Sequence, residues 1–242
     1  MLVQRLNTAY KLTGKKLDVY LTPKAKRLLK ANFTLAEYNR ILDPFFYVSE
    51  SNADAALSSI DHLQKSDKFL FNHSLNVGIF SVIIGKKAGL RLYEHLLIGG
   101  ILHDIGKTLI PSSVLYEPGK LTDEKFNMIK KHPLLGAYYL RNNKISDLVI
   151  LDIVISHHVY FDKSGYPKIL CAKPASDYSQ IVTISDAFEA MCSNRIYSEA
   201  KSLAEAVKEL KEKRGSQFHP DFLDIFLEYA PEFYELVNEK EI

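Results

Sequence analysis

From about residue 66 onward, hydrophobic residues recur along the chain with the period of an α-helix. The first predicted helix shows this clearly, because positions i, i+4, i+7 and i+11 of one face are His73, Val77, Phe80 and Ile84. The pattern therefore places His73 on the buried face of its helix. Further helices are predicted over residues 93–105, 123–131, 180–192 and 202–215, and from residue 220 onward. The fold class that follows is mainly α.

Local signals refine these predicted helices. Gly99 and Gly100 would let a neighbouring backbone approach closely beside His103, and Gly106 suits a left-handed cap at the end of that helix. Pro133 is expected to start a helix that His132 caps. Residues 148–158 are rich in Val and Ile, so periodicity alone fits either a strand or a buried helix there.

The first 65 residues have a different character. Two short strand-like pieces, 17–21 and 45–48, flank predicted helix starts at Thr22-Pro23 and at the capping box Thr34–Glu37. We therefore expect a small N-terminal α/β module over residues 1–65, with an input or dimerisation role, followed by a helical domain over residues 66–242. A homodimer is one possible consequence of such a module.

Composition narrows the class of protein. The 242 residues are 47% hydrophobic and 25% charged, as in an ordinary globular protein, and the formal net charge of +2 does not favour a nucleic-acid polymer as partner. No apolar run approaches the roughly 18 residues of a membrane span, and a signal-peptide pattern is absent. Cys171 and Cys192 are the only cysteines, which excludes a thiolate zinc site. We expect a cytoplasmic protein without membrane contact.

The candidate chemistry is a series of histidines and aspartates. Five of the eight histidines and two aspartates recur at intervals: His73, His103, Asp104, His132, His157, His158 and Asp186. Imidazole and carboxylate groups are the ligands that hold iron, manganese or zinc where thiolate is absent. Any one of these seven residues alone would be interpreted as a structural residue. His62, His95 and His219, which lie outside the series, are interpreted in that way. Burying five imidazoles without a partner would be costly, so the series favours a dinuclear metal hydrolase.

These motifs together resemble the HD-GYP phosphodiesterases, a branch of the HD hydrolase superfamily that degrades cyclic di-GMP. The resemblance runs from about residue 66 to residue 228. Its motifs are His73, 103–107, Ile110-Pro111, 117–122, 132–136, His157-His158 with Asp162, Gly165-Tyr166-Pro167, 186–195 and Gln217-Phe218. It implies an HD-type all-helical bundle.

The resemblance also implies a ligand set for two divalent metal ions. One metal would be held by His73, His103, Asp104 and Asp186, and the second by His132, His157 and His158, with Asp104 bridging the two. A hydroxide that bridges both metals would attack the phosphodiester and give pGpG, GMP or both. Iron or manganese is the expected pair, while zinc, nickel and cobalt stay open.

Contacts to the substrate follow from the same resemblance. Lys107 would neutralise a phosphate oxygen beside the catalytic Asp104, and Arg195 would contact the other phosphate of the cyclic dinucleotide. The loop Gly165-Tyr166-Pro167 would recognise the substrate, with the Tyr166 ring against a guanine, and would bind protein partners. Asp162 is expected either to support a ligating histidine or simply to cap this loop.

Four positions depart from the family pattern. Phe69 stands where some members carry a glutamate that helps to hold a third metal, so we expect two metals. Lys163 replaces a usual glycine, which predicts a different backbone in the recognition loop. Glu189 and Asn194 replace usual aspartates near Asp186 and Arg195. These departures leave two alternatives open: hydrolysis of another nucleotide or cyclic dinucleotide, and a signalling protein that binds cyclic di-GMP with little turnover.

Overall fold

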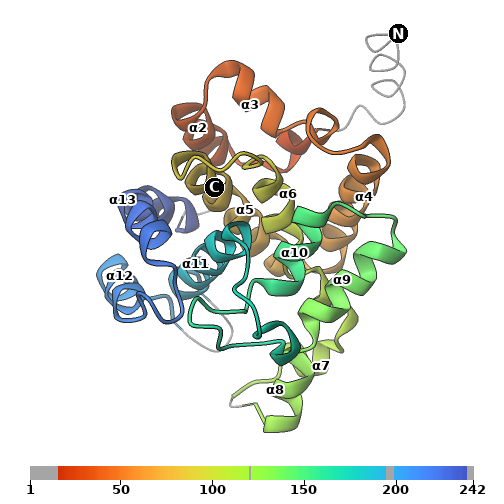
Figure 1. Ribbon diagram of the computed structural model, residues 1–242, viewed down its shortest axis with the longest axis vertical. Coiled ribbons are helices and arrows are strands. Elements are labelled where there is room, and N and C mark those ends of the chain that lie inside the picture. Colours follow the sequence, from red (N-terminus) through yellow and green to blue (C-terminus); the bar gives the residue numbers. More distant parts are fainter. Residues whose placement is uncertain (1–15, 120, 195–198, 239–242) are drawn as a thin grey trace.

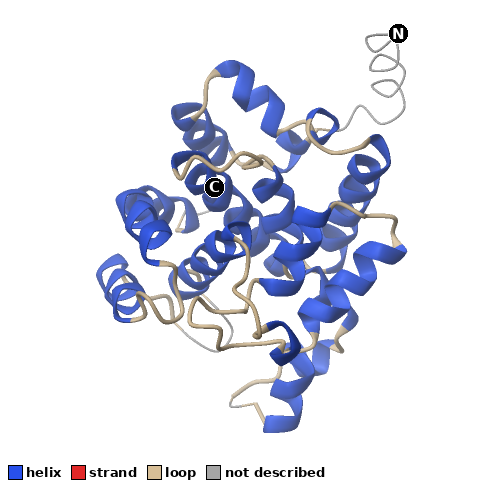
Figure 2. Ribbon diagram, in the orientation of Figure 1, coloured by secondary structure: helices blue, strands red, loops and turns tan. Residues whose placement is uncertain are grey.

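The computed structural model describes residues 16–119, 121–194 and 199–238 of the chain. Over these residues the protein consists of helices joined by loops, as Figure 2 shows. The described residues contain no strand; only two isolated β-bridges occur, between Val159 and Gly165 and between Arg214 and Phe218. The prediction of a mainly α, all-helical fold is confirmed.

The elements follow one another along the chain, with α and 3₁₀ (η) helices mixed. The N-terminal ones are η1 (Leu17–Tyr20), α2 (Pro23–Asn32), α3 (Leu35–Ile41), η2 (Pro44–Phe46) and α4 (Glu50–Ser66). The middle ones are α5 (Lys68–Lys87), α6 (His95–Leu102), η3 (Ile105–Leu109), α7 (Ser112–Leu115), α8 (Asp123–Ile129) and α9 (His132–Asn142). The last ones are α10 (Leu148–Ser156), η4 (Lys168–Leu170), α11 (Asp177–Cys192), α12 (Leu203–Glu212) and α13 (Pro220–Val237).

Helix α5 lies at the centre of the bundle and packs against α2, α4, α6, α11 and α13 (Figure 1). Fourteen of its twenty residues are buried. Its closest neighbour is α6, where a Cβ added to Gly100 would lie 2.5 Å from the Cα of Gly78. The predicted close approach beside His103 is therefore confirmed, and it depends on side-chain-free positions on both helices.

The two strand-like pieces near the N-terminus are wrong as strands. Leu17 and Tyr20 are both buried, and their spacing of three puts them on the same side of a 3₁₀ helix rather than on alternate sides of a strand. In the second piece Pro44 presets the backbone, while the Asp43 side chain accepts the backbone N–H of Phe45 at 3.3 Å. The N-terminal region is thus helical, with no α/β character over the residues described.

The N-terminal helices share their hydrophobic core with the rest of the molecule. One buried apolar cluster extends from Leu17 to Leu236, and Leu29 of α2 is fully buried in it. A separate input or dimerisation role for residues 1–65 stays a prediction. None of the helices in the described ranges combines the length and the apolar character that crossing a membrane would take.

Several predicted helix boundaries are confirmed by their caps. The capping boxes Thr34–Glu37 and Ser202–Glu205 are both formed, and Thr22 caps α2. Helix α10 resolves the ambiguous segment as a buried helix rather than a strand. Helix α9 already includes His132, one residue earlier than expected, with Lys131 at its N-cap.

The interpretation of Gly106 as a left-handed cap is wrong. Its backbone is not among the described residues with positive φ. Instead, a Cβ at this position would lie 2.0 Å from the carbonyl oxygen of His132. Glycine is needed here because η3 and the start of α9 touch through their backbones, and this contact brings His132 beside His103 and Asp104.

Candidate metal centre

The fold brings all seven predicted ligands towards one point from five parts of the chain. His73 comes from α5, His103 and Asp104 follow α6, His132 begins α9, His157 and His158 follow α10, and Asp186 lies in α11. Two groups of side-chain donors, Asp104 with His132, His157 and His158, and Asp104 with His73 and His103, each have ligand atoms within 4.8 Å of one another. Residues far apart in sequence thus form one cluster, as the family resemblance implied.

Asp104 lies between the two groups and faces each with a different oxygen. Its Oδ2 is 3.3 Å from Nε2 of His103 and 3.7 Å from Nε2 of His73. Its Oδ1 is 3.0 Å from Nε2 of His132 and 3.9 Å from Nε2 of His157. This is the arrangement in which one carboxylate can be shared by two cations.

Asp186 completes the first group. Its Oδ1 lies 3.1 Å from Nε2 of His73 and 3.7 Å from Nε2 of His103. The imidazoles of this group and Asp104 are at most 3% exposed, and Asp186 is 16% exposed. Asp186 is therefore the side of this group that solvent can reach.

The imidazoles of three ligands are held in one tautomer by the backbone. Nδ1 of His103 donates to the carbonyl of Gly100 at 2.7 Å, and Nδ1 of His132 donates to that of Ile129 at 2.9 Å. Nδ1 of His157 donates in the same way to a carbonyl of its own helix at 3.0 Å. In its neutral form, a ring that donates through Nδ1 presents the lone pair of Nε2, so each of the three rings directs the nitrogen that can bind a metal at the cluster.

Electrostatics keeps the carboxylates charged. Burial raises the pKa of Asp104, but the charges of Lys107 and His103 outweigh burial and hold that pKa well below its usual range. Burial likewise opposes ionisation of Asp186, yet its interactions with the imidazoles of His103 and His73 lower its pKa well below the usual range. Burial lowers the pKa of His103, but Asp104 and Asp186 raise it to about 10. In the metal-free protein, a proton on His103 thus balances charge that a cation would otherwise balance.

The other group of imidazoles is neutral. Burial, followed by electrostatic repulsion from a proton on the neighbouring His132 imidazole when that ring is protonated, lowers the pKa of His158 to about 3, and burial lowers that of His157 well below its usual range. Nε2 of His132 and Nε2 of His157 are only 3.1 Å apart. Because both Nδ1 atoms already donate to carbonyls, two lone pairs face each other across this distance.

The donor set therefore fits two divalent cations. Nε2 of His73, Nε2 of His103 and Oδ1 of Asp104 are buried without a well-directed hydrogen-bond partner. Buried polar atoms without partners are costly, and facing lone pairs repel, so a cation at each group would satisfy both demands. Histidine and carboxylate donors without thiolate suit iron or manganese, although the same set also accepts zinc, cobalt or nickel.

The predicted substrate-binding residues lie around this cluster. Nζ of Lys107 donates to Oδ2 of Asp104, and the lysine side chain is 22% exposed at the rim. The ring of Tyr166 lies against His158, with ring centroids 4.4 Å apart and an angle of 31° between the rings. Gly165 has φ +88°, and a Cβ there would lie 2.1 Å from the carbonyl oxygen of His158, so this position requires glycine. Pro167 follows in the same loop, and Arg195 lies outside the described residues.

The loop after α10 is ordered by local contacts. Oδ1 of Asp162 accepts the backbone N–H of Ser164 at 2.8 Å, so Asp162 caps the loop, the simpler of its two expected roles. Lys163 has φ +67°, a left-handed conformation that glycine favours. Lys163 therefore adopts a backbone conformation that glycine would adopt without strain, and whether the loop differs from that of the family stays a prediction.

The histidines read as structural lie apart from the cluster. Nε2 of His95 is 3.3 Å from Oδ2 of Asp147, which is the N-cap of α10. The ring of His62 stacks on Tyr139, and His219 is the N-cap of α13. Phe69 lies one turn before His73 on α5 and offers no ligand atom, consistent with the departure noted in the sequence.

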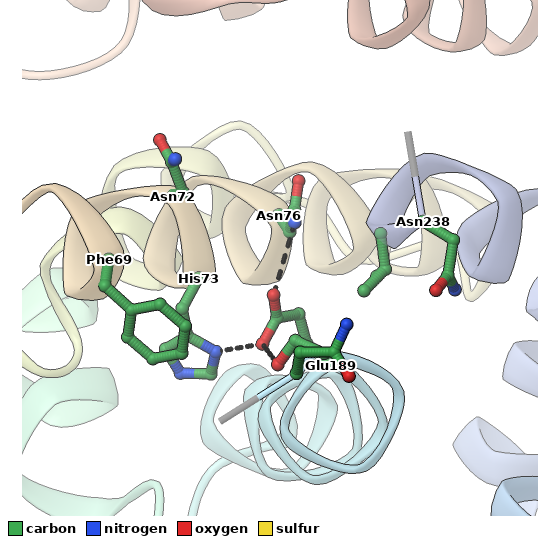
Figure 3. A pocket seen from close by; sticks show the side chains of 9 residues that line it. Phe69, Asn72, His73, Asn76, Glu189 and Asn238 are labelled. Atoms are coloured by element: carbon green, nitrogen blue, oxygen red, sulfur yellow. Dashed lines mark hydrogen bonds and ion pairs between the residues drawn. The ribbon is translucent and has the colours of Figure 1, made fainter. Parts of the chain in front are cut away.

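Sequence reasoning missed the role of Glu189. Its carboxylate accepts a hydrogen bond from Nδ1 of His73 (Figure 3). Asp186 lies at the other nitrogen of the ring, Nε2. The signal was available, because Asp186 and Glu189 are spaced i, i+3 and so share one face of α11. Sequence alone could not show that this face is the one that meets α5.

Comparisons with known proteins agree with this site. The family model described as HD domain matches residues 61–222, which include all seven candidate ligands. A cyclic di-GMP phosphodiesterase of Thermotoga maritima is 29% identical and aligns with 98% of this chain and 64% of its own length. The cyclic di-GMP phosphodiesterase PA4108 of Pseudomonas aeruginosa is 31% identical over 71% of this chain and 42% of its own. The 3'3'-cGAMP-specific phosphodiesterase 2 of Vibrio cholerae is 33% identical, and the alignment covers 54% of this chain and 26% of that protein.

A solved structure shows the same fold. Bd1817, described as an HDG"Y"P protein from Bdellovibrio bacteriovorus, superposes with a TM-score of 0.58 at 19% identity, over 95% of this chain and 78% of that one. The chain spans about two thirds or less of the length of these curated relatives. It belongs to the HD domain family, and its similarity lies with the HD-GYP phosphodiesterase branch of that family.

Proposed function

We propose that this protein is a metal-dependent phosphodiesterase that hydrolyses cyclic di-GMP to pGpG, GMP or both. The observation that carries the proposal is the position of Asp104, whose two oxygens face two separate groups of imidazoles. The matched relatives named as cyclic di-GMP phosphodiesterases support the choice of substrate.

The chain offers a distinct set of donors for each of two metals. His73, His103 and Asp186 would hold one, His132, His157 and His158 the other, and Asp104 both. When bound, two divalent cations would acidify a water molecule and neutralise the charge that builds up on the phosphate during attack. The burial of the imidazoles keeps bulk water away from this point, which strengthens each electrostatic interaction there.

Residues at the rim would place the substrate. The Lys107 ammonium already lies beside the carboxylate of Asp104, so a phosphate that enters would meet a positive charge next to the metals. Tyr166 presents an aromatic ring next to His158, where it can pack against a guanine. Arg195 is proposed for the second phosphate, and the Gly165-Tyr166-Pro167 loop for contacts with protein partners, on the family resemblance alone.

The test is hydrolysis of cyclic di-GMP followed by chromatography, after anaerobic reconstitution with Fe(II) or Mn(II). We expect metal-dependent pGpG or GMP from the wild type and none from Asp104→Ala. Product formed equally by the Asp104→Ala variant would contradict the proposed site. Bound metal without product from the wild type would instead favour the binding protein with little turnover.

A second candidate substrate is another cyclic dinucleotide, and 3'3'-cGAMP is favoured by one of the matched relatives. The catalytic residues would be the same, and the difference would arise in the loop that contains Lys163 and Tyr166. Turnover of cyclic di-GMP, 3'3'-cGAMP and cyclic di-AMP under identical conditions separates these possibilities. A higher kcat/KM for 3'3'-cGAMP would replace cyclic di-GMP in the proposal.

A further inference from the structure

Helix α11 meets the His73 imidazole at both of its nitrogens. Oδ1 of Asp186 lies 3.1 Å from Nε2, while Oε2 of Glu189 accepts a hydrogen bond from Nδ1. Glu189 is 2% exposed, so its charge is taken out of water to make this contact. His73 differs in this respect from the three imidazoles whose Nδ1 atoms donate to backbone carbonyls.

The Glu189 carboxylate is itself held at both oxygens. Asn76, one turn beyond His73 on α5, donates from Nδ2 to Oε1 at 3.3 Å. Ser193, one turn beyond Glu189 on α11, donates from Oγ to Oε2 at 3.2 Å. Figure 3 shows the contacts of Glu189 with His73 and Asn76 of α5. The carboxylate therefore has a fixed position from which it can orient the ring.

A polar cavity of about 340 Å³ lies on this side of His73. Asn72, Asn76, Phe69 and Glu189 are among its lining residues (Figure 3). Asn194 lines it as well. Water in such a cavity could compete for Nδ1 and let the ring turn. A charged acceptor fixed by two donors opposes this competition more strongly than a neutral carbonyl would.

We propose that Glu189 is a positioning residue that holds His73 with Nε2 directed at the first metal and makes this nitrogen a stronger donor. A carboxylate on the far nitrogen of a ligating histidine fixes the tautomer and raises the basicity of the ligand. Asn76 and Ser193 act through Glu189. This inference rests on the proposed function, because it assigns His73 to a metal.

The test measures Mn(II) binding by titration calorimetry on the metal-free protein, with hydrolysis measured separately. Glu189→Gln keeps the shape and removes the charge, and Glu189→Asp keeps the charge but withdraws it by about one C–C bond, ~1.5 Å. We expect both to weaken one of the two binding steps by about 10- to 100-fold and to leave the other unchanged. Glu228→Gln, an exposed change on α13, should bind as the wild type does.

The selective loss distinguishes positioning from a general loosening of the fold, which would weaken both steps together. Should the Glu189 variants not fold, Asn76→Ala and Ser193→Ala, which leave the charge in place, should each weaken the same step several-fold. Wild-type affinity in all of these variants would overturn the inference while leaving the proposed function intact. A wild-type protein that binds neither Mn(II) nor Fe(II) would overturn both.

Discussion

At the scale of single residues, the cluster contains imidazoles whose pKa values are shifted in opposite directions. Burial and electrostatic repulsion from the neighbouring His132 imidazole lower the pKa of His158 to about 3, whereas Asp104 and Asp186 overcome burial and raise that of His103 to about 10. An unfolded histidine has a pKa of about 6.5. The two residues therefore make the stability of the metal-free protein depend on pH in opposite directions.

The sign of each effect follows from proton linkage. His158 has a lower pKa in the folded state, so its contribution is present above about pH 6.5 and is lost as the pH falls towards 3. His103 has a raised pKa, so its contribution is present below about pH 6.5 and is lost as the pH rises towards 10. Urea unfolding of the metal-free protein should show maximal stability near pH 6.5. His158→Gln should flatten the acid side, whereas the exposed control His62→Gln should not.

Lys163 gives a second prediction at this scale. It is exposed and has a left-handed backbone, which costs a residue with a side chain about 1 to 2 kcal/mol. Lys163→Gly should therefore raise the free energy of unfolding by about 1 kcal/mol, and the β-branched Lys163→Val should lower it. Urea denaturation of the wild type and of both variants at one pH measures these differences in the free energy of unfolding. A destabilising Lys163→Gly change would mean that the lysine side chain makes a contact that outweighs the strain.

At the scale of elements, the adjacent glycines of α6 provide a matched pair. A Cβ at Gly100 would meet backbone, with the Cα of Gly78 at 2.5 Å, whereas at Gly99 it would meet the flexible end of Ile153 at 2.4 Å. Gly100→Ala should thus force α5 and α6 apart and cost about 2 to 3 kcal/mol, and Gly99→Ala should cost clearly less. Chemical denaturation measures both. Equal losses would show that the backbone contact at Gly100 is no more restrictive than the contact of Gly99 with Ile153, because helix propensity alone would favour alanine at both positions.

What the sequence could predict at this scale depends on how local the signal is. The periodicity of α5 and the capping boxes at Thr34 and Ser202 are local, and the structure confirms them. The 3₁₀ helix at Leu17–Tyr20 was mistaken for a strand because four residues fit either period. The need for glycine at position 106 could not be explained from the local sequence, because it arises from the carbonyl of His132, 26 positions later. Glu189 was missed for the same cause: its partner lies on another helix.

At the scale of the whole molecule, the N-terminal helices and the candidate metal centre share one hydrophobic core. Leu29 of α2 is fully buried, and α2 packs on α5, the helix that carries His73. Leu29→Ala should lower the free energy of unfolding of the entire protein by about 2 to 5 kcal/mol. Circular dichroism and loss of Mn(II) binding should report one coincident transition. Two separate transitions would instead support residues 1–65 as an independent module.

The distribution of the donors over α5, α6, α9, α10 and α11 has a consequence for how the protein is made. No short stretch of nascent chain contains a complete site, because His73 comes early and Asp186 arrives only with α11. The proposed metals would then find a complete set of donors only once the bundle has brought these helices together. The metal that this protein acquires would be set by what the cell supplies at the moment folding is complete, rather than by capture during synthesis.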